Sequence, residues 1–287
     1  MISLLWSTLL WAQEFPKKLL QARDQSMGLE IPERINMISQ SLRGIPYLFN
    51  PEGEETGVDS DPMWNFAHMD CLTYVEAVLA FSISDNVIEA LEVRNDLRYL
   101  QDEIHYQNRK HFMFTQWIPH NLELGYIQEI TGEIGNTRNI VRSYDAKIWN
   151  NWRSRKKIFL EEDNYPIGDF SLEVLSPQEA LDQIEHIPSG SILIVVRDSG
   201  WGNPIMVSHI GFVIRNKKNQ IKMRHATTMG SPKGVKEHTL KWYLKHLRDY
   251  PYRWKVAGVS IFYPKYPGDH GLDHPHREDR QEDRKKN

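Results

Sequence analysis

The sequence predicts an α+β protein in which helices come first and an antiparallel sheet follows. Two stretches of the first hundred residues predict helices: 70–82 places apolar residues at helical spacing, and 32–42 lies between a proline suited to a first turn and a glycine stop. In the second half, residues 191–196 (SILIVV) form a β-branched run that is typical of a buried strand. Residues 209–215 and 221–227 flank the polar turn NKKNQ, as the two strands of a hairpin do. This order of elements is that of an α+β fold.

The composition is that of a globular protein. The chain has 287 residues, of which 40% are hydrophobic and 25% are charged. The net charge is −3, from 35 basic and 38 acidic residues, so the basic excess of a general nucleic-acid binder is missing. Cys71 is the single cysteine, which excludes an intramolecular disulfide and a multi-cysteine metal site. Nothing in the sequence shows an exposed apolar seam, and we expect a monomer.

The first helix is predicted over residues 32–42, because Pro32 suits a first turn and Gly44 supplies a stop. Residues 44–64 are rich in turn formers and predict a long loop. Asp70 then begins the apolar helix 70–82, and residues 85–101 continue as a helix.

The rest of the chain is predicted to contain most of the sheet. Residues 105–164 are polar and aromatic with several glycines, which indicates short strands and loops. Ser176 is a suitable N-cap for a helix over 177–186. After the hairpin we expect a helix over 238–248 and a final strand over 254–263.

The two ends differ from the middle. Residues 1–12 are apolar and too short to span a bilayer; they suggest a signal or leader segment within residues 1–20 and a periplasmic or secreted protein. The alternative is a cytoplasmic protein whose first helix is buried. Residues 265–287 are polar and charged, which predicts a disordered tail. Between them we expect a single catalytic domain, 30–264, with an inserted segment around 105–175 and no stable membrane insertion.

Cys71 is a candidate nucleophile because of its place in the chain. With Asp70 as N-cap, Cys71 is the first helical residue. A helix N-terminus lowers the pKa of a thiol, and its free N–H groups can stabilise an oxyanion. The alternative is a small buried core cysteine.

The predicted hairpin carries two histidines that could supply the base such a thiol needs. If the turn centres on Lys217, His209 and His225 face each other; a shift of one residue makes their contact diagonal, and the spacing leaves both open. In either case one imidazole can orient the other. Gly211 shares the face of His209 and leaves room for another element.

These motifs resemble the NlpC-type papain-like cysteine hydrolases of bacterial cell walls. The matching motifs are D-C at a helix start, S-H-I-G on one strand and R-H-A-T on the next. The resemblance implies a papain-like fold in which the cysteine helix packs on a central antiparallel sheet. It also implies that Cys71 is the nucleophile, His209 the base and His225 the orienting residue. Tyr47, in GIPYLF, corresponds to a family tyrosine near the oxyanion site, although residues 48–70 make a longer spacer than the family usually has.

A longer ordered set of motifs resembles one branch of that family. The motifs are DCLTYVEAVLA, the R-Y of LRYLQDEIHYQNRKHF, WIPHN, SHIGFVIR and RHAT, and the match as a whole spans roughly residues 35–264. They resemble the branch described as N-acetylmuramoyl-L-alanine amidase-like, formerly a domain of unknown function. This resemblance implies a peptidoglycan or muropeptide substrate, cleavage between the muramic acid lactyl group and L-alanine, and no cofactor.

A segment of mixed polarity offers candidate substrate contacts. Arg109 can fork onto a carboxylate, Trp117 can stack on a sugar, and Asn121 can pair with an amide; His111 is the fourth candidate of this segment. The alternative is that Arg109 and His111 cap local structure while Trp117 packs in the core. Two further residues in loops are candidates for the cleft wall: Trp64 and Trp201.

Three other functions remain open at this point. One is a D-glutamyl-diamino-acid endopeptidase that uses the same chemistry on another bond. Another is a zinc enzyme with Cys71, His209 and His225 as ligands and a water in the open position. The third is a cell-wall-binding module without catalysis. We expect a thiol enzyme without a metal.

Overall fold

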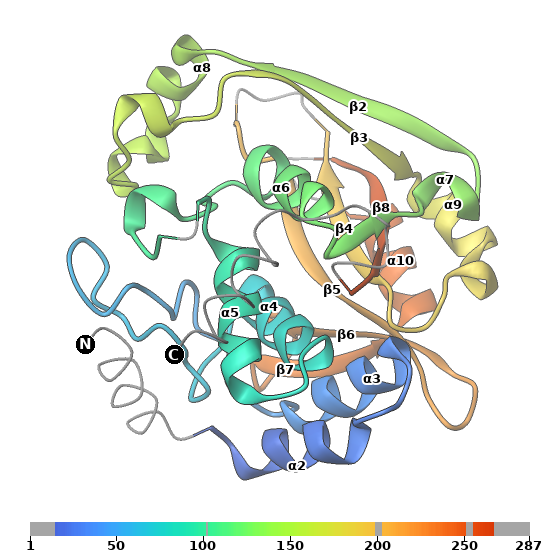
Figure 1. Cartoon of the computed structure of the whole chain (residues 1–287). Coiled ribbons are helices and arrows are strands. Elements are labelled where there is room, and N and C mark those ends of the chain that lie inside the picture. Colours follow the sequence, from blue (N-terminus) through green and yellow to red (C-terminus); the bar gives the residue numbers. More distant parts are fainter. Residues whose placement is uncertain (1–14, 102, 199–202, 251–254, 267–287) are drawn as a thin grey trace, which may run out of the picture.

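The computed structural model describes residues 15–101, 103–198, 203–250 and 255–266. It confirms the predicted α+β class: an eight-stranded antiparallel sheet has helices on both faces (Figure 1). The strand order is β2-β3-β8-β4-β5-β6-β7, and β1 pairs with β8. The strands are β1 (Ile127–Glu129), β2 (Thr137–Tyr144), β3 (Gly168–Leu175), β4 (Ile192–Arg197), β5 (Val207–Arg215), β6 (Ile221–Thr227), β7 (Gly234–Thr239) and β8 (Val256–Pro264).

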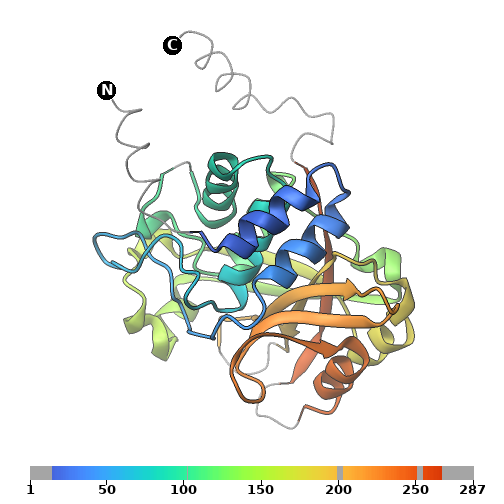
Figure 2. The ribbon, with the colours of Figure 1, turned by 90° about the horizontal axis from the view of Figure 1, so that it is seen from below.

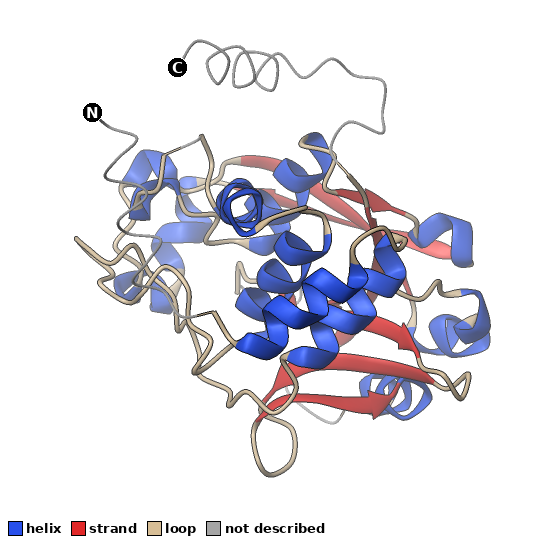
Figure 3. Ribbon diagram, turned by 60° about the horizontal axis from the view of Figure 1, so that its bottom comes forward, coloured by secondary structure: helices blue, strands red, loops and turns tan. Residues whose placement is uncertain are grey.

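The two faces of the sheet bury separate hydrophobic clusters. The N-terminal helices lie across the strands on one face of the sheet (Figure 3). Ile194 and Phe212 point to this face, whereas Leu193 and Val213 point to the other. Since side chains alternate along a strand, the central strands are apolar on both sides, which explains the unbroken run SILIVV. The first face is covered by α2 (Lys17–Ser26), α3 (Ile31–Ser41), α4 (Cys71–Ser82) and α5 (Val87–Arg98), and the second by α9 (Pro177–Asp182) and α10 (Leu240–Arg248).

The predicted helices of the N-terminal half are confirmed within a few residues. Gly44, which has φ +90°, follows the end of α3 as expected. The structure also contains a helix that was not predicted, α2, which lies beside α3 (Figure 2) and buries Leu19. The predicted leader boundary at residue 20 therefore falls inside a helix; residues 1–14 lie outside the described residues, as do 267–287 of the predicted tail.

The predicted helix over 238–248 begins too early. Thr239 is its N-cap, because the Thr239 hydroxyl accepts a hydrogen bond from the N–H of Trp242, and α10 starts at Leu240. Residues 234–239 instead form the edge strand β7, which pairs with β6. His238 is therefore a strand residue, and this places it on the sheet beside the predicted site.

The segment around 105–175 is more ordered than the sequence predicts. Its strands β2 and β3 pair along eight residues each and form one edge of the sheet (Figure 1). The remainder consists of short helices, among them a π-helix over Met113–Trp117, α6 (Ile118–Glu123), α7 (Thr131–Ile134) and α8 (Ala146–Asn151). Within the described residues, no helix has the length and apolar character to cross a membrane.

Candidate active site

The first turn of α4 holds Cys71 in a fixed place. Asp70 is the N-cap: its Oδ1 accepts the N–H groups of Leu72 (3.0 Å) and Thr73 (2.9 Å), and the Thr73 hydroxyl accepts the N–H of Asp70. Oδ2 of Asp70 accepts a further hydrogen bond from the N–H of Asn50 at 3.0 Å. Because this capping box occupies two amides of the turn, the N–H of Cys71 itself is the amide that remains for an oxyanion.

Strands β5 and β6 separate where α4 meets them. Their pairing ends at Phe212 and Arg224. Yet β5 begins at Val207 beside β4, and β6 runs on to Thr227 beside β7. The two strands therefore diverge beyond this pair, and α4 contacts both of them.

The divergence frees one backbone amide for the thiol. Val213 makes its backbone hydrogen bonds toward β4, so its neighbours on β5 direct theirs toward β6. Ile210 lies two residues before Phe212 on β5, so its backbone groups point to the same side as those of Phe212. At Ile210, however, β6 no longer pairs with β5. The N–H of Ile210 donates to the thiol of Cys71 instead. The sulfur of Cys71 thus lies close to the N–H of Ile210, the residue that follows His209.

Three histidines make a continuous row across β5, β6 and β7, which we call the histidine row. Nε2 of His209 lies 2.6 Å from Nδ1 of His225, and Nε2 of His225 lies 2.9 Å from Nδ1 of His238. The strand register makes both contacts diagonal and centres the hairpin turn on Lys218. Of the two arrangements that the sequence leaves open, the diagonal one is present.

Gly211 lies under the histidine row and has a different use from the expected one. A Cβ at this position would lie 2.7 Å from Cβ of His225, 2.7 Å from Cε of Met223 and 2.9 Å from the Arg224 carbonyl oxygen. The room beside His209 is therefore filled by His225 itself. The missing side chain lets the two imidazoles come into contact.

Two tyrosines complete the surroundings of the thiol. Tyr47 reaches Cys71 because a parallel bridge joins it to Met69, so the long spacer folds back. The pKa of Tyr47 is raised by burial and by the nearby Cys71 and Asp70. Tyr243, on α10, is buried and lies with its ring centroid 5.2 Å from that of His225.

The ionisation of the thiol is opposite to the sequence prediction. Burial and, less strongly, Asp70 raise the pKa of Cys71 to about 12, although the N–H of Ile210 acts in the lowering direction. Burial and the nearby His238 lower the pKa of His209 to about 4. The prediction of a lowered thiol pKa is wrong because desolvation outweighs the helix N-terminus. Both groups are neutral near pH 7, and both side chains are partly exposed.

The predicted substrate contacts lie mainly in the interior. Trp117 is 0% exposed and its Nε1–H donates to Glu76. Asn121 is also 0% exposed; its amide donates to the Leu97 carbonyl and accepts from Lys110. Neither side chain lines an open surface, so these two predictions are corrected: Trp117 packs and Asn121 ties α6 to α5.

Arg109 and Trp64 are also structural, and His111 is largely so. Arg109, 6% exposed, forms ion pairs with Glu54 (2.6 Å) and Asp59 (2.9 Å). Trp64, 4% exposed, packs in the core under Arg94. Nε2 of His111 lies 2.7 Å from the carbonyl of Tyr106, in keeping with the capping alternative. Trp201 lies outside the described residues.

His238 is the residue that the sequence prediction misses. The periodic apolar residues of α10 follow it directly, so the pattern includes it in the helix. The run GVKEHT before that helix is the part of the sequence that could have indicated a strand. Only the folded sheet shows how this run pairs with RHAT.

The arrangement does not suit the zinc alternative. Both ring nitrogens of His225 are engaged by other imidazoles, which leaves no lone pair for a metal. Among the described residues, no group of three or more His, Cys, Asp and Glu is placed to hold a metal ion.

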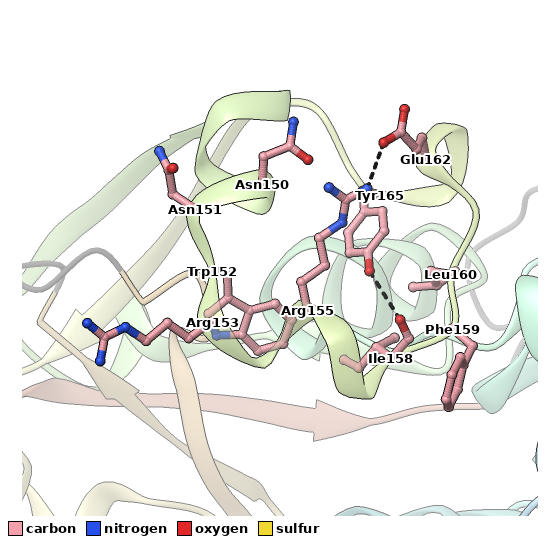
Figure 4. A pocket seen from close by; sticks show the side chains of 10 residues that line it. All are labelled: Asn150, Asn151, Trp152, Arg153, Arg155, Ile158, Phe159, Leu160, Glu162 and Tyr165. Atoms are coloured by element: carbon pink, nitrogen blue, oxygen red, sulfur yellow. Dashed lines mark hydrogen bonds and ion pairs between the residues drawn. The ribbon is translucent and has the colours of Figure 1, made fainter.

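A separate hollow lies between α8 and Tyr165 (Figure 4). Arg155 pairs with Glu162 at 3.0 Å on its rim. Its lining contains neither Cys71 nor a member of the histidine row, so it is not the site described above.

Comparisons with known proteins agree with this architecture. The chain matches the family described as N-acetylmuramoyl-L-alanine amidase-like over residues 37–249. A Legionella pneumophila protein from a domain-of-unknown-function family has a TM-score of 0.74 at 21% identity, covering 87% of this chain and 94% of that one. An N-acetylmuramoyl-L-alanine amidase from Bacteroides uniformis has a TM-score of 0.58 at 21% identity, covering 77% and 93%. At such identities the likeness shows a shared fold, and no curated protein matches. Since the family match includes Tyr47, Cys71 and the histidine row, and spans well over half of the sequence, the chain belongs to the N-acetylmuramoyl-L-alanine amidase-like family.

Proposed function

We propose that this protein is a cysteine hydrolase of peptidoglycan, which cleaves the amide between N-acetylmuramic acid and L-alanine. Membership of the amidase-like family supports the substrate class. The observation that carries the chemistry is the contact of His209 with His225. His209 directly precedes Ile210, whose N–H donates to Cys71. A partly exposed thiol, a neutral imidazole and an ordered second imidazole are the parts of a nucleophile-and-base pair.

The first half of the reaction acylates the thiol. Nε2 of His209 faces His225, so Nδ1 is the nitrogen that takes the Cys71 proton. The sulfur bonds to the lactyl carbonyl carbon, and the oxyanion accepts hydrogen bonds from the N–H of Cys71 and the hydroxyl of Tyr47. His209 then gives its proton to the amide nitrogen as the carbon–nitrogen bond breaks. The peptide leaves with a free L-alanine amine, and a thioester remains.

The second half releases the sugar. His209 takes a proton from water, whose oxygen attacks the thioester carbonyl, and returns a proton to the departing sulfur. The product is muramic acid with a free lactyl carboxylate. Because burial raises the pKa of Cys71 and lowers that of His209, we expect the proton to move during attack rather than before it.

The test is digestion of defined muropeptides by the full chain, with mass spectrometry of the products. We expect free peptide beginning with L-alanine and sugar ending in the lactyl acid. Cys71→Ala should keep its circular dichroism spectrum and lose at least about 100-fold in turnover. Full activity in this variant would end the proposal.

The same assay separates the alternatives. An endopeptidase would leave L-Ala-D-Glu on the sugar, which the product masses distinguish from an amidase. Iodoacetamide should stop the reaction and a metal chelator should not, since the chemistry assigned here needs the thiol. A wall-binding module would bind muropeptides in the wild type without releasing any product.

A further inference from the structure

The third member of the histidine row has no role in the chemistry above. Nδ1 of His238 lies 2.9 Å from Nε2 of His225. Its ring stacks on Trp242 of α10, with centroids 4.8 Å apart and planes 27° apart. His225 is fully buried, whereas His238 is partly exposed. The row therefore joins the partly exposed His209 to a second point of contact with solvent.

A row of neutral imidazoles has a direction. Each neutral ring carries one N–H, so each contact needs a donor on one ring and an acceptor on the next. Only two orders satisfy both contacts. Either all three rings carry the proton on Nε2, or all three carry it on Nδ1. In the first order, Nδ1 of His209 has a free lone pair and serves as the base; in the second order, it does not.

The surroundings keep the row neutral. His225 is buried between two other rings, and burial is the main cause of its lowered pKa. The charged or titratable groups that face His238 are Lys236 on its own strand, His246 on α10 and His225 on β6. All three are potential cations, so a further proton on the row is disfavoured.

We propose that His238 is a positioning residue that sets the direction of the row. Its Nδ1 accepts the Nε2–H of His225, whose Nδ1 then accepts the Nε2–H of His209. The partly exposed ring of His238 selects this order because a neutral histidine in water carries its proton mainly on Nε2. This inference rests on the proposed function of His209, which it explains: the base is ready because a residue two strands away fixes its tautomer.

Two substitutions distinguish the loss of the hydrogen-bond acceptor at position 238 from the loss of the shape of the side chain. In His238→Asn, the amide oxygen takes the place of Nδ1 and can accept the same hydrogen bond. In His238→Leu, no acceptor remains, and the Nε2–H of the buried His225 is left unpaired. His246→Leu is the matched control, because it removes a neighbouring histidine that does not contact His225.

The first measurement is ¹⁵N NMR of the histidine rings in the full chain carrying Cys71→Ala, which needs no activity. We expect the Nε2–H tautomer at His209 and His225 in the parent, the His238→Asn variant and the His246→Leu control. We expect a shift toward Nδ1–H in His238→Leu. Unchanged ring shifts in His238→Leu, in a variant that remains folded, would overturn the inference.

The second measurement is muropeptide hydrolysis with Cys71 intact. His238→Leu should lose about tenfold in kcat with little change in KM. The unpaired N–H of His225 makes the order in which His209 can act as base about tenfold less populated. His238→Asn should recover most of kcat. A purely structural role would instead lower the melting temperature and leave the tautomers alone. If the tautomers respond and no variant hydrolyses muropeptides, the proposed function fails while the ordering by His238 stands.

Discussion

At the scale of single residues, the site depends on a thiol and an imidazole that are both uncharged. Burial is the main cause of both pKa shifts, which leave Cys71 protonated and His209 unprotonated across the neutral range. The N–H of Ile210 counters part of this effect at the sulfur. In the proposed reaction, the charge that develops during attack would be stabilised by fixed N–H groups near the sulfur, as expected for a preorganised site.

Gly211 offers a residue-scale prediction. In Gly211→Ala, the new Cβ would overlap Cβ of His225 and the Arg224 carbonyl, so β5 and β6 must move apart. We expect the free energy of unfolding to fall by about 1–3 kcal/mol, as for other overpacked sites. Turnover should fall as well, since the His209–His225 contact lengthens. Urea unfolding and muropeptide hydrolysis measure the two effects.

The matched control is Val213→Ala, which removes packing from the same face of β5 without pushing β6. It should lose stability and keep most of its turnover. Equal loss of turnover in both variants would contradict the positional role given to Gly211.

At the scale of elements, the segment between α3 and α4 is held by buried ion pairs. Arg94 and Arg98 of α5 pair with Glu52, at 2.9 and 3.6 Å, and Arg109 pairs with Glu54. These contacts fix a long segment that has little regular structure. Its start carries Tyr47 to the thiol, and its Asn50 supports the N-cap of α4. Arg94, Arg98 and Arg109 therefore hold this segment in place through ion pairs with its carboxylates.

Arg109→Met tests this structural role against substrate binding. Removing the guanidinium leaves the buried Glu54 carboxylate without its ion pair, and breaking such a pair costs about 3–5 kcal/mol. We expect a lower melting temperature, with KM for muropeptides little changed in protein that remains folded. The double variant Arg109→Met/Glu54→Met should regain much of the stability. A large rise in KM without a loss of stability would restore the role in substrate binding.

At the scale of the whole molecule, histidines with lowered pKa values make stability depend on pH. The folded protein holds His209 with a pKa of about 4, below the ordinary value of about 6.5. His225 is shifted in the same direction, and His111 has a pKa of about 4. Since the unfolded chain binds these protons first, the stabilisation is complete above pH 6.5 and is lost as pH falls toward 4.

We expect the free energy of unfolding to fall by about 1.4 kcal/mol per pH unit for each such histidine below pH 6.5, or roughly 3 kcal/mol for His209 down to pH 4. Urea unfolding at a series of pH values, in wild type and in His209→Asn, measures this. The variant should show a slope that is shallower by one proton. Equal slopes would mean that His209 is not held neutral by the fold.

The pattern of the chain predicts the elements whose signals are local. The start of α4 is predicted because Asp70 and the apolar run after it are neighbours in sequence. The strand β4 and the hairpin of β5 and β6 are predicted for the same reason. The edge strand β7 is missed because its residues are polar and precede a strongly periodic helix, and only pairing with β6 makes them a strand.

The substrate contacts show the limit of residue chemistry without burial. Arg109 and Trp117 have side chains suited to sugars and carboxylates, and the sequence offers no sign that Glu54 and Glu76 are their partners. Those carboxylates lie 55 and 41 positions away along the chain. Pairs so distant along the chain come together only when the protein folds.

Amino-acid order alone establishes the class of fold, the capped helix that begins at Cys71 and the hairpin that carries His209 and His225, since each follows from capping, periodicity or turn chemistry among near neighbours. Folding in three dimensions adds the diagonal register, the third histidine and the burial that raises the pKa of the thiol. These depend on which strands pair and how much water is excluded, and both are properties of contacts between residues far apart in the chain.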